Sequence, residues 1–372
     1  MGKRVILAVA GAGKTYHICH NINPDKKNLI LAFTHENIYN IIKELTKSFG
    51  SIPAKTTICT FHSFVYRLLI RPYEPTIFDV YGEQFKNTRG VSFAEIPKSF
   101  CTDGTRKWSN KNYHKVTEIA HFMTPSRQYY CGLMTDLLIR VNKKNKKNKN
   151  FLPHIFKSIN EFYEAIYVDE FQDFREKDFE IIKMMVLNVE NILLVGDYYQ
   201  HSVSGKNNTG MPFKDGKKSI SYEQFISELA SCGFEVDSHL LNKSRRCSAE
   251  VCAFIREKLG IKIFSQDIHQ GKIIEVPENR VKELISNDDI VKLVYSNAKN
   301  YNCFCKNWSY SKGDTYDSIC VVLTEKSNNI FKENWNNNLS ESSRNKLYVA
   351  LTRSSGDVYI MSSQQFAREV SK

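Results

Sequence analysis

The stretch that most constrains this chain is a glycine-rich turn near its start, followed by Lys-Thr. The apolar run Val5-Ile6-Leu7 precedes the turn and predicts a buried strand, and a helix is expected over residues 15–20. Two glycines let the backbone direct its N–H groups toward an anion, and the helix N-terminus adds partial positive charge. Although Ala8 replaces the first glycine of the strict pattern, the context predicts a phosphate-binding loop rather than an ordinary strand–turn–helix; its residues include Ala10, Gly11, Ala12, Gly13, Lys14 and Thr15.

A pair of acidic residues after a later apolar strand predicts the other half of a nucleotide site. Lys14 can reach the β- and γ-phosphates of ATP, and the Thr15 hydroxyl can ligate Mg²⁺. In Asp169-Glu170-Phe171-Gln172-Asp173, Asp169 would hold the Mg²⁺ ion and Glu170 would orient and deprotonate the attacking water. Gln172 could sense the γ-phosphate through its amide. The alternative is an acidic N-cap before the next helix.

Alternating strand and helix patterns predict an α/β fold with parallel sheets. In the first part of the chain we expect strands near 28–34, 56–63, 165–170 and 192–197, and helices near 36–49, 64–70, 176–187 and 222–230. A polar, flexible segment is expected over 202–218. In the second part we expect strands near 236–241, 272–276, 290–295, 318–323 and 358–361, and helices near 249–259, 280–286 and 342–353.

Residues 71–153 interrupt this alternation and are basic, aromatic and irregular in pattern. Residues 81–154 hold 14 lysines and arginines against 5 acidic residues, a net charge of +9 in a chain whose total is +12. This placement favours a polyanion partner. The lysine-rich run 143–150 predicts a mobile loop, which either contacts phosphates or is simply solvated.

The cysteines predict neither a zinc site nor a disulfide framework. Ten cysteines are scattered without a C-x-x-C pair, and Cys303 and Cys305, alternating along a potential strand, are expected on opposite faces. No run is apolar enough for a membrane span, and the N-terminal apolar stretch does not read as a signal peptide. We therefore expect a cytoplasmic protein with no membrane association.

Eight motifs in order resemble those of superfamily 1 DNA helicases of the UvrD/Rep type. They begin with the glycine-rich turn and end close to the C-terminus, so the resemblance spans almost the whole chain. They are residues 8–15, Ala32-Phe33-Thr34-His35-Glu36-Asn37, Thr60-Phe61-His62-Ser63-Phe64, Val168-Asp169-Glu170-Phe171-Gln172-Asp173, Leu194-Val195-Gly196-Asp197-Tyr198-Tyr199-Gln200, Asn242-Lys243-Ser244-Arg245-Arg246-Cys247-Ser248, Ser311-Lys312-Gly313-Asp314-Thr315-Tyr316-Asp317 and Tyr348-Val349-Ala350-Leu351-Thr352-Arg353.

The resemblance implies two RecA-like P-loop domains with ATP and Mg²⁺ at their interface. Domain 1A would comprise residues 1–75 and 155–235, a basic 1B-like insertion residues 76–154, and domain 2A residues 236–372. Only about 65 residues separate Ser248 from Gly313, where large UvrD/Rep enzymes carry a 2B subdomain, so no full 2B is expected.

The resemblance also implies roles for individual residues. Gln200 would couple the γ-phosphate to DNA binding, and Arg246 and Arg353 would be arginine fingers, because guanidinium groups suit a transferring phosphoryl group. The alternative for Arg353 is a helix C-terminal cation. Arg245 stands where a tyrosine usually stacks on adenine, and Gly313 belongs to a nucleotide-contacting motif. Single-stranded DNA would be contacted by Phe33, Thr34, Thr60, Phe61, His62 and Ser63.

Two functions remain open. The first is an ATP hydrolase that moves along, or unwinds, single-stranded or partly duplex DNA. The second is an ATP-gated regulatory subunit of a complex with a nuclease, as in antiphage defence systems of the Gabija type, with little unwinding of its own. A nucleoside kinase lacks support, because Glu170 and two arginines suit attack by water better than transfer to a small acceptor.

Overall fold

The computed structural model describes residues 2–102, 107–144, 150–174, 176–201, 214–215, 218–333, 335 and 338–370. Most of the predicted polar segment 202–218 and the centre of the lysine-rich run, residues 145–149, lie outside this range. The chain packs into two compact units, which are described separately. The first comprises Met1–Val5, Ile18–Leu194 and Ser204–Glu235, and the second comprises Ile6–His17, Val195–Val203 and Val236–Lys372.

The first unit is built around a sheet of six strands. Its strands in sheet order are β12 (Glu235–Asp237), β1 (Lys3–Leu7), β9 (Ile192–Gly196), β8 (Ala165–Asp169), β2 (Asn28–Ala32) and β3 (Thr56–Thr60). The last residues of β1, β9 and β12 belong to the second unit. β2 runs parallel to both β3 and β8. Every residue of β2, β8 and β9 is buried, as expected for a sheet with helices on its faces.

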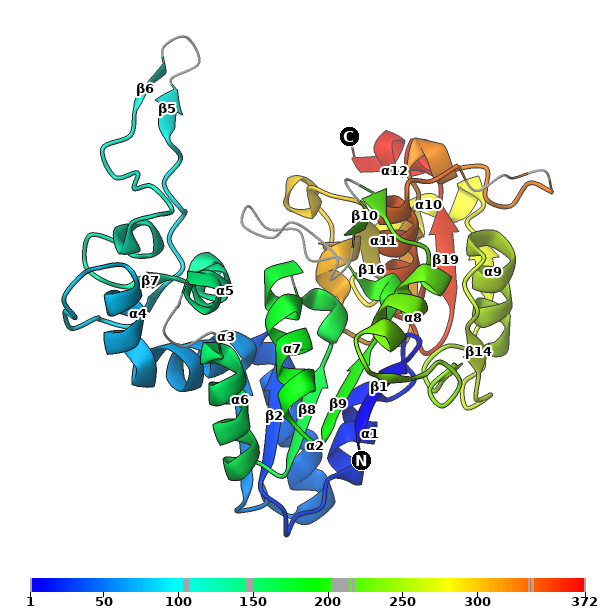
Figure 1. Ribbon diagram of the computed structural model, residues 1–372. Coiled ribbons are helices and arrows are strands. Elements are labelled where there is room, and N and C mark those ends of the chain that lie inside the picture. Colours follow the sequence, from blue (N-terminus) through cyan, green and yellow to red (C-terminus); the bar gives the residue numbers. More distant parts are fainter. Residues whose placement is uncertain are drawn as a thin grey trace. The chain divides into compact units, whose positions relative to one another are not determined.

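Helices cover this sheet. Four of them lie where the sequence pattern predicts a helix, whereas the helix over residues 151–162 was not predicted. The helices are α1 (Lys14–Asn21), α2 (His35–Phe49), α6 (Phe151–Phe162), α7 (Glu176–Asn188) and α8 (Tyr222–Ser231). α2 buries Ile41 and Leu45 and ends at Gly50, whose positive φ of 76° closes the helix. α6 and α7 run side by side (Figure 1).

The predicted helix over residues 64–70 is wrong in kind. Residues 61–64 form one short α-turn, α3 (Phe61–Phe64), and Val65–Ile70 form a π-helix, followed by a 3₁₀ turn at Arg71–Tyr73. The apolar spacing that predicts an α-helix also fits a wider helical turn, so sequence periodicity does not separate the two. A π-helical turn is rare and often stands beside functional residues.

The basic insertion is more regular than its sequence suggests. It holds α4 (Glu74–Val80), β4 (Val91–Ser92), β7 (Tyr129–Tyr130) and α5 (Met134–Lys144), so reading it as wholly irregular was wrong. α5 buries an apolar face that includes Leu137, Leu138 and Val141. β5 (Phe100–Thr102) and β6 (Lys107–Ser109) pair antiparallel. Figure 1 shows this hairpin as an arm that extends away from α4 and α5.

The second unit contains a sheet of five parallel strands. Their order is β15 (Ile273–Glu275), β19 (Val358–Met361), β18 (Ile319–Val322), β16 (Val291–Val294) and β17 (Cys305–Asn307). Its helices are α9 (Ala249–Leu259), α10 (Val281–Ser286), α11 (Glu341–Leu351) and α12 (Ser363–Val370). Its core includes Val251, Trp308, Val321, Leu347 and Tyr348. A two-stranded parallel pair, β13 (Lys243–Ser244) with β14 (Phe264–Ser265), completes the unit.

Two expectations about strands are corrected. The strand expected at 236–241 is only β12, and it lies beside β1 in the first sheet instead of opening the second. β17 had not been assigned as a strand of the sheet. Cys303 and Cys305 do not point to opposite faces, since their Sγ atoms are 3.0 Å apart. The expectation was also wrong in principle, because residues two apart along a strand share a face.

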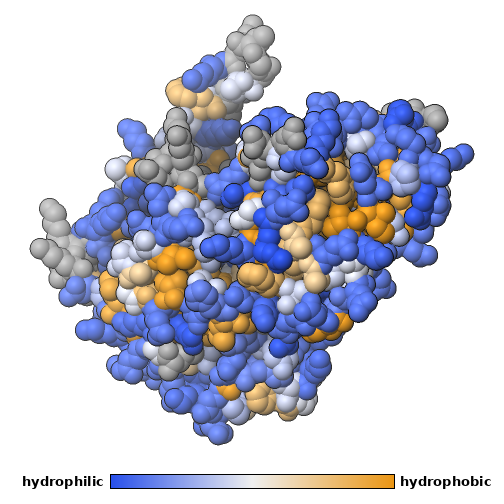
Figure 2. Space-filling model, turned by 90° about the vertical axis from the view of Figure 1, so that its right-hand side faces the viewer, coloured by the Kyte–Doolittle hydropathy of each residue, from blue (hydrophilic) through white to orange (hydrophobic). Residues whose placement is uncertain are grey.

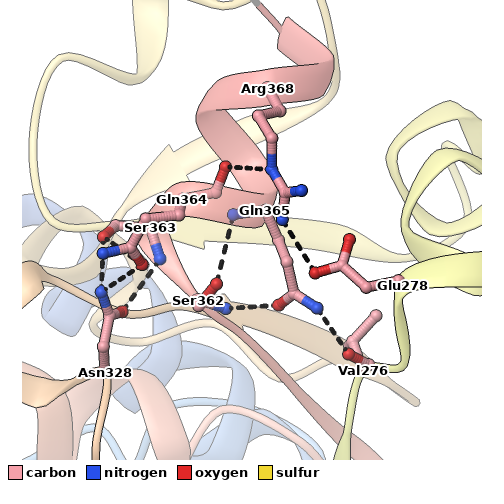
Figure 3. A network of polar contacts seen from close by, with 8 residues as sticks. All are labelled: Val276, Glu278, Asn328, Ser362, Ser363, Gln364, Gln365 and Arg368. Atoms are coloured by element: carbon pink, nitrogen blue, oxygen red, sulfur yellow. Dashed lines mark hydrogen bonds and ion pairs between the residues drawn. The ribbon is translucent and has the colours of Figure 1, made fainter.

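The last helix is fixed to its unit by polar contacts (Figure 3). Asn328 bonds Ser363 in both directions, at 2.8 and 3.0 Å. The Gln365 amide donates to the Val276 carbonyl at 2.8 Å, and Arg368 pairs with Glu278 at 2.8 Å. These contacts, together with packing against α10, fix α12 to the second unit, so it is not a free tail.

The surface drawn in Figure 2 is mostly hydrophilic, with hydrophobic residues gathered in separate patches. Within the described residues, no helix combines the length and the apolar character needed to cross a bilayer.

Candidate functional site

The acidic pair and the predicted DNA-contacting residues meet at one edge of the first sheet. Leu31 of β2 pairs with Val168 of β8, and Ala32 pairs with Thr60 of β3. These parallel strands therefore end together. Asp169, only 1% exposed, closes β8 at this edge, where α/β sheets bind their ligands. Beside it, burial and the Asp169 charge raise the pKa of the Cys19 thiol to about 12, so this neighbour stays neutral.

Glu170 follows Asp169 in an unusual backbone conformation. Its φ of 53° and ψ of 42° lie in the left-handed region, which non-glycine residues enter rarely and often at functional sites. The Glu170 amide donates to Asp169 Oδ1 at 3.0 Å, and the Gln172 side chain donates to the Glu170 carboxylate. This turn directs a half-buried carboxylate at the strand end and ties it to the buried Gln172 amide. A buried carboxylate such as Asp169 also supplies the oxygen ligand that Mg²⁺ prefers.

Two threonines at this edge are helix caps. The Thr34 hydroxyl accepts from the Asn37 amide at 3.1 Å at the start of α2, and the Thr60 hydroxyl accepts from the Ser63 amide at 3.2 Å at the start of α3. The half-buried Phe33 and His62 rings lie 5.5 Å apart. Phe33, Thr34, His62 and Ser63 thus stand on adjoining turns, and each keeps some exposure for a ligand.

Phe61 is placed differently. It is fully buried, and its ring meets Phe174 edge-on at 4.7 Å between centroids. Phe174 also contacts Phe33 at 5.7 Å. In this structure Phe61 therefore supports the residues at the edge from beneath and offers no face on which a base could stack.

The predicted phosphate-binding loop lies in the second unit and needs both of its glycines. Gly11 has a φ of 70° and Gly13 a φ of 84°, conformations that a side chain disfavours. The His17 amide donates to the Gly13 carbonyl at 2.8 Å, so the helix starts directly at the loop. Lys14 is 8% exposed.

Residues 241–246 lie directly against this loop. The Val9 amide donates to the Leu241 carbonyl and the Arg245 amide to the Gly11 carbonyl, both at 2.9 Å. A Cβ on Gly11 would stand 2.6 Å from Ser244 Oγ and 2.8 Å from Arg246 Cβ. Gly11 is thus required twice, by its φ and by this close approach.

The two adjacent arginines are held separately. The Arg245 guanidinium lies over the Tyr16 ring, 4.7 Å from its centroid, so stacking is already part of its environment. Arg246 donates to the Thr352 carbonyl at 3.0 Å. That bond ties Arg246 to the end of α11, next to the second predicted arginine finger.

Arg353 is 2% exposed, follows the end of α11, and bonds back to the last turn of that helix. Its Nε donates to the Val349 carbonyl at 2.8 Å, and its terminal nitrogen bonds the Thr352 hydroxyl at 3.1 Å. It therefore also sits as a cation at a helix C-terminus. Gly313 has a φ of 96°, and the following Asp314 pairs with Lys306 at 3.0 Å.

Gln200 ends a 3₁₀ turn, Tyr198–Gln200, directly after β9. Its amide nitrogen donates to Asp197 Oδ2 at 2.9 Å, and Asp197 is fully buried. The sequence reading named Gln200 but assigned no role to Asp197 or to Tyr348, whose hydroxyl also bonds Asp197. The only sequence signal for these two residues was that each lies within one of the eight motifs.

Two family models match this chain over more than half its length. The viral superfamily 1 RNA helicase core domain matches residues 115–362, and an AAA domain matches residues 2–206.

Two curated proteins are similar at low identity. ATP-dependent DNA helicase PcrA of Bacillus subtilis is 22% identical over 228 residues, which cover 53% of this chain and 31% of PcrA. The probable DNA helicase II homolog of Mycoplasma genitalium is 26% identical over 240 residues, covering 54% of this chain and 34% of that protein. The chain thus spans about a third of the length of the curated relatives it matches.

Solved structures similar to this chain include the PRRSV helicase, with 12% identity and a TM-score of 0.45, covering 99% of this chain and 54% of that one. Arterivirus nonstructural protein 10 (helicase) with DNA gives 14% identity and a TM-score of 0.45, covering 99% and 63%.

Proposed function

The chain belongs to the superfamily 1 helicases, and on that premise we propose that it is an ATP-dependent translocase or helicase acting on single-stranded or partly duplex DNA. It would couple Mg-ATP hydrolysis to domain closure on the nucleic acid. The observation that carries this proposal is the common edge of β8, β2 and β3. There the predicted hydrolytic base, Glu170, stands one strand from Thr34 and two strands from Ser63.

This adjacency supports direct coupling between hydrolysis and DNA contact. The Phe33 ring contacts Phe174, four residues after Glu170, and it also contacts His62. A shift of a strand of DNA along Thr34, His62 and Ser63 would therefore press on the segment that follows Glu170. Because packed aromatic rings deform little, such a shift would reach the turn that orients the carboxylate.

Each residue of the nucleotide site has a proposed task. Lys14 and the loop amides would bind phosphates, and Thr15 with Asp169 would hold Mg²⁺. The ion would neutralise charge on the phosphates. Glu170 would accept a proton from the attacking water, with Gln172 fixing its carboxylate. Gln200 would contact the γ-phosphate, and Arg246 and Arg353 would stabilise charge in the transition state. Arg245 would stack on the base, and Gly313 would lie near the nucleotide.

The rival function is an ATP-gated subunit of a nuclease-containing, antiphage complex. It uses the same nucleotide site but requires no stimulation by DNA. The two functions therefore differ in one measurable quantity, the dependence of ATP hydrolysis on single-stranded DNA.

The test measures steady-state ATP hydrolysis by the purified full chain with and without a single-stranded DNA oligonucleotide. We expect DNA to raise kcat at least tenfold, and Glu170→Gln to lower the stimulated kcat about 100-fold or more, since it removes a general base. Glu170→Gln should still bind ATP. Hydrolysis that the oligonucleotide does not change would overturn the translocase proposal, and a partner whose activity depends on ATP would then support the rival.

A further inference from the structure

A buried carboxylate, that of Asp197, accepts hydrogen bonds from the turn that carries Gln200. Asp197 Oδ1 accepts from the Tyr199 amide at 3.0 Å, and Oδ2 accepts from the Gln200 side chain at 2.9 Å. The Gln200 amide also donates to the Asp197 carbonyl at 3.0 Å. Asp197 is 0% and Gln200 3% exposed, so the bond between their side chains forms out of water, where its loss is costly.

The Tyr348 hydroxyl joins this carboxylate to the phosphate-binding loop. It donates to Asp197 Oδ2 at 3.1 Å and accepts from the Ala10 amide at 2.8 Å. Tyr348 is fully buried, and both burial and the Asp197 charge hold its pKa well above the usual value. The hydroxyl therefore keeps its proton at every physiological pH. One oxygen atom thus links a loop amide, through Asp197, to the Gln200 side chain.

One face of α11 contacts the same turn at three positions. Glu341 accepts from the Tyr198 hydroxyl at 3.1 Å, the Arg344 guanidinium lies 5.6 Å from the Tyr199 ring centroid, and Tyr348 bonds Asp197. These three positions are spaced by three and four residues, so they share a helix face. α11 ends at Leu351, and Arg353, two residues further on, bonds back to the Val349 carbonyl at 2.8 Å. A displacement at Arg353 would therefore act on the last turn of the helix that carries Tyr348.

From these contacts we propose that Tyr348 is a positioning residue for ATP hydrolysis: its hydroxyl holds the predicted phosphate-binding loop directly, at the Ala10 amide, and the Gln200 side chain through Asp197, and so couples α11 to the nucleotide. The inference rests on the proposed ATPase. Tyr348 itself touches no substrate. Its effect should appear in kcat and in stimulation by DNA, because it fixes the geometry of Gln200, and less in the KM for ATP.

The test uses Tyr348→Phe in the full chain, which keeps the ring and removes only the hydroxyl. We expect the DNA-stimulated kcat to fall about tenfold, with the KM for ATP changed less than threefold. The matched control is Tyr198→Phe, which removes a hydroxyl bond of the same 3.1 Å length between the same turn and α11. It should leave kcat within about twofold of the wild type. Thermal unfolding of both variants shows whether each is folded at the assay temperature.

A double variant separates positioning from general loosening. If Tyr348 acts through Gln200, then Tyr348→Phe should lower kcat less than twofold in a Gln200→Ala background. Equal kcat values for Tyr348→Phe and Tyr198→Phe, or a full tenfold loss in the Gln200→Ala background, would overturn the inference. A wild type without ATP hydrolysis would instead remove the proposed function on which it rests.

Discussion

The turn at Asp197 and the hairpin of β5 and β6 use polar and aromatic side chains in opposite ways. Around Asp197, the polar atoms are buried or half-buried and are bonded at 2.8 to 3.1 Å. On the hairpin, Phe100 is 47% and Trp108 49% exposed, and the Lys107 ammonium lies 4.4 Å from the Phe100 ring centroid. The first region fixes one geometry. The hairpin exposes aromatic rings and positive charge to solvent, and its geometry does not select one binding partner.

This difference matches two kinds of task. Hydrolysis needs groups held to within a fraction of an ångström, which buried bonds provide. Contact with a flexible polyanion needs positive charge and accessible ring faces, and it tolerates movement. We therefore expect substitutions in the first region to change rates and stability, and substitutions in the second to change affinity for DNA.

The largest expected effect follows from adding one methyl group to the loop. Gly11→Ala places a Cβ 2.6 Å from Ser244 Oγ and forces a φ of 70° on alanine. We expect ATP hydrolysis to fall more than tenfold and the free energy of unfolding to fall by about 3 kcal/mol. The control is Gly82→Ala in the insertion, where φ is 73° and nothing lies within 4 Å. Chemical denaturation should show a loss of only about 1 kcal/mol there. Equal losses would mean that backbone strain alone acts at Gly11.

A smaller effect is expected on the hairpin. Trp108→Ala should weaken binding of a fluorescent single-stranded oligonucleotide about five- to tenfold, because a stacked base contributes about 1–3 kcal/mol. ATP hydrolysis without DNA should not change. Phe264→Ala is the control, since Phe264 is 42% exposed with the Arg256 guanidinium 4.8 Å away, yet lies in the second unit. If both variants bind DNA as the wild type does, the hairpin is not a DNA-contacting surface.

The smallest effect should come from an exposed ion pair in the second unit. Arg368→Ala removes the contact with Glu278. The side chains of Arg368 and Glu278 are 61% and 65% exposed. Water screens such pairs, so we expect the free energy of unfolding to change by less than about 0.5 kcal/mol. Thermal unfolding measures this directly. A loss above about 2 kcal/mol would show that exposure does not separate weak from strong contacts in this chain.

Much of the fold followed from local patterns. α9 and β19 have the predicted bounds, because Ser248 and Gly260 cap α9 and apolar residues run through β19. Three features did not follow. The π-helix shares its apolar spacing with an α-helix. The C-terminal end of α5 falls in a lysine-rich run, which is typical of a loop. β12 pairs with β1, a strand that is distant in sequence, and no local pattern indicates that pairing.

The candidate site likewise has residues that the sequence predicted and features that it could not predict. The motifs indicated Glu170 and Gln200, because each of these residues lies in a short turn within its own motif. The burial of Phe61 could not be read from its motif, since the same aromatic residue serves as support or as platform. Tyr348 and Asp197 are 151 residues apart, and no local pattern links two such positions.

The bond between Ala10 and Tyr348 spans 338 residues, nearly the whole chain. During synthesis, the Tyr348 hydroxyl leaves the ribosome 338 residues after the Ala10 amide that it contacts. Contacts so distant in sequence form late, because the chain must first close a long loop. The turn at Ala10 therefore lacks this contact until Tyr348 has been synthesised, and a chain terminated before Tyr348 would lack it altogether.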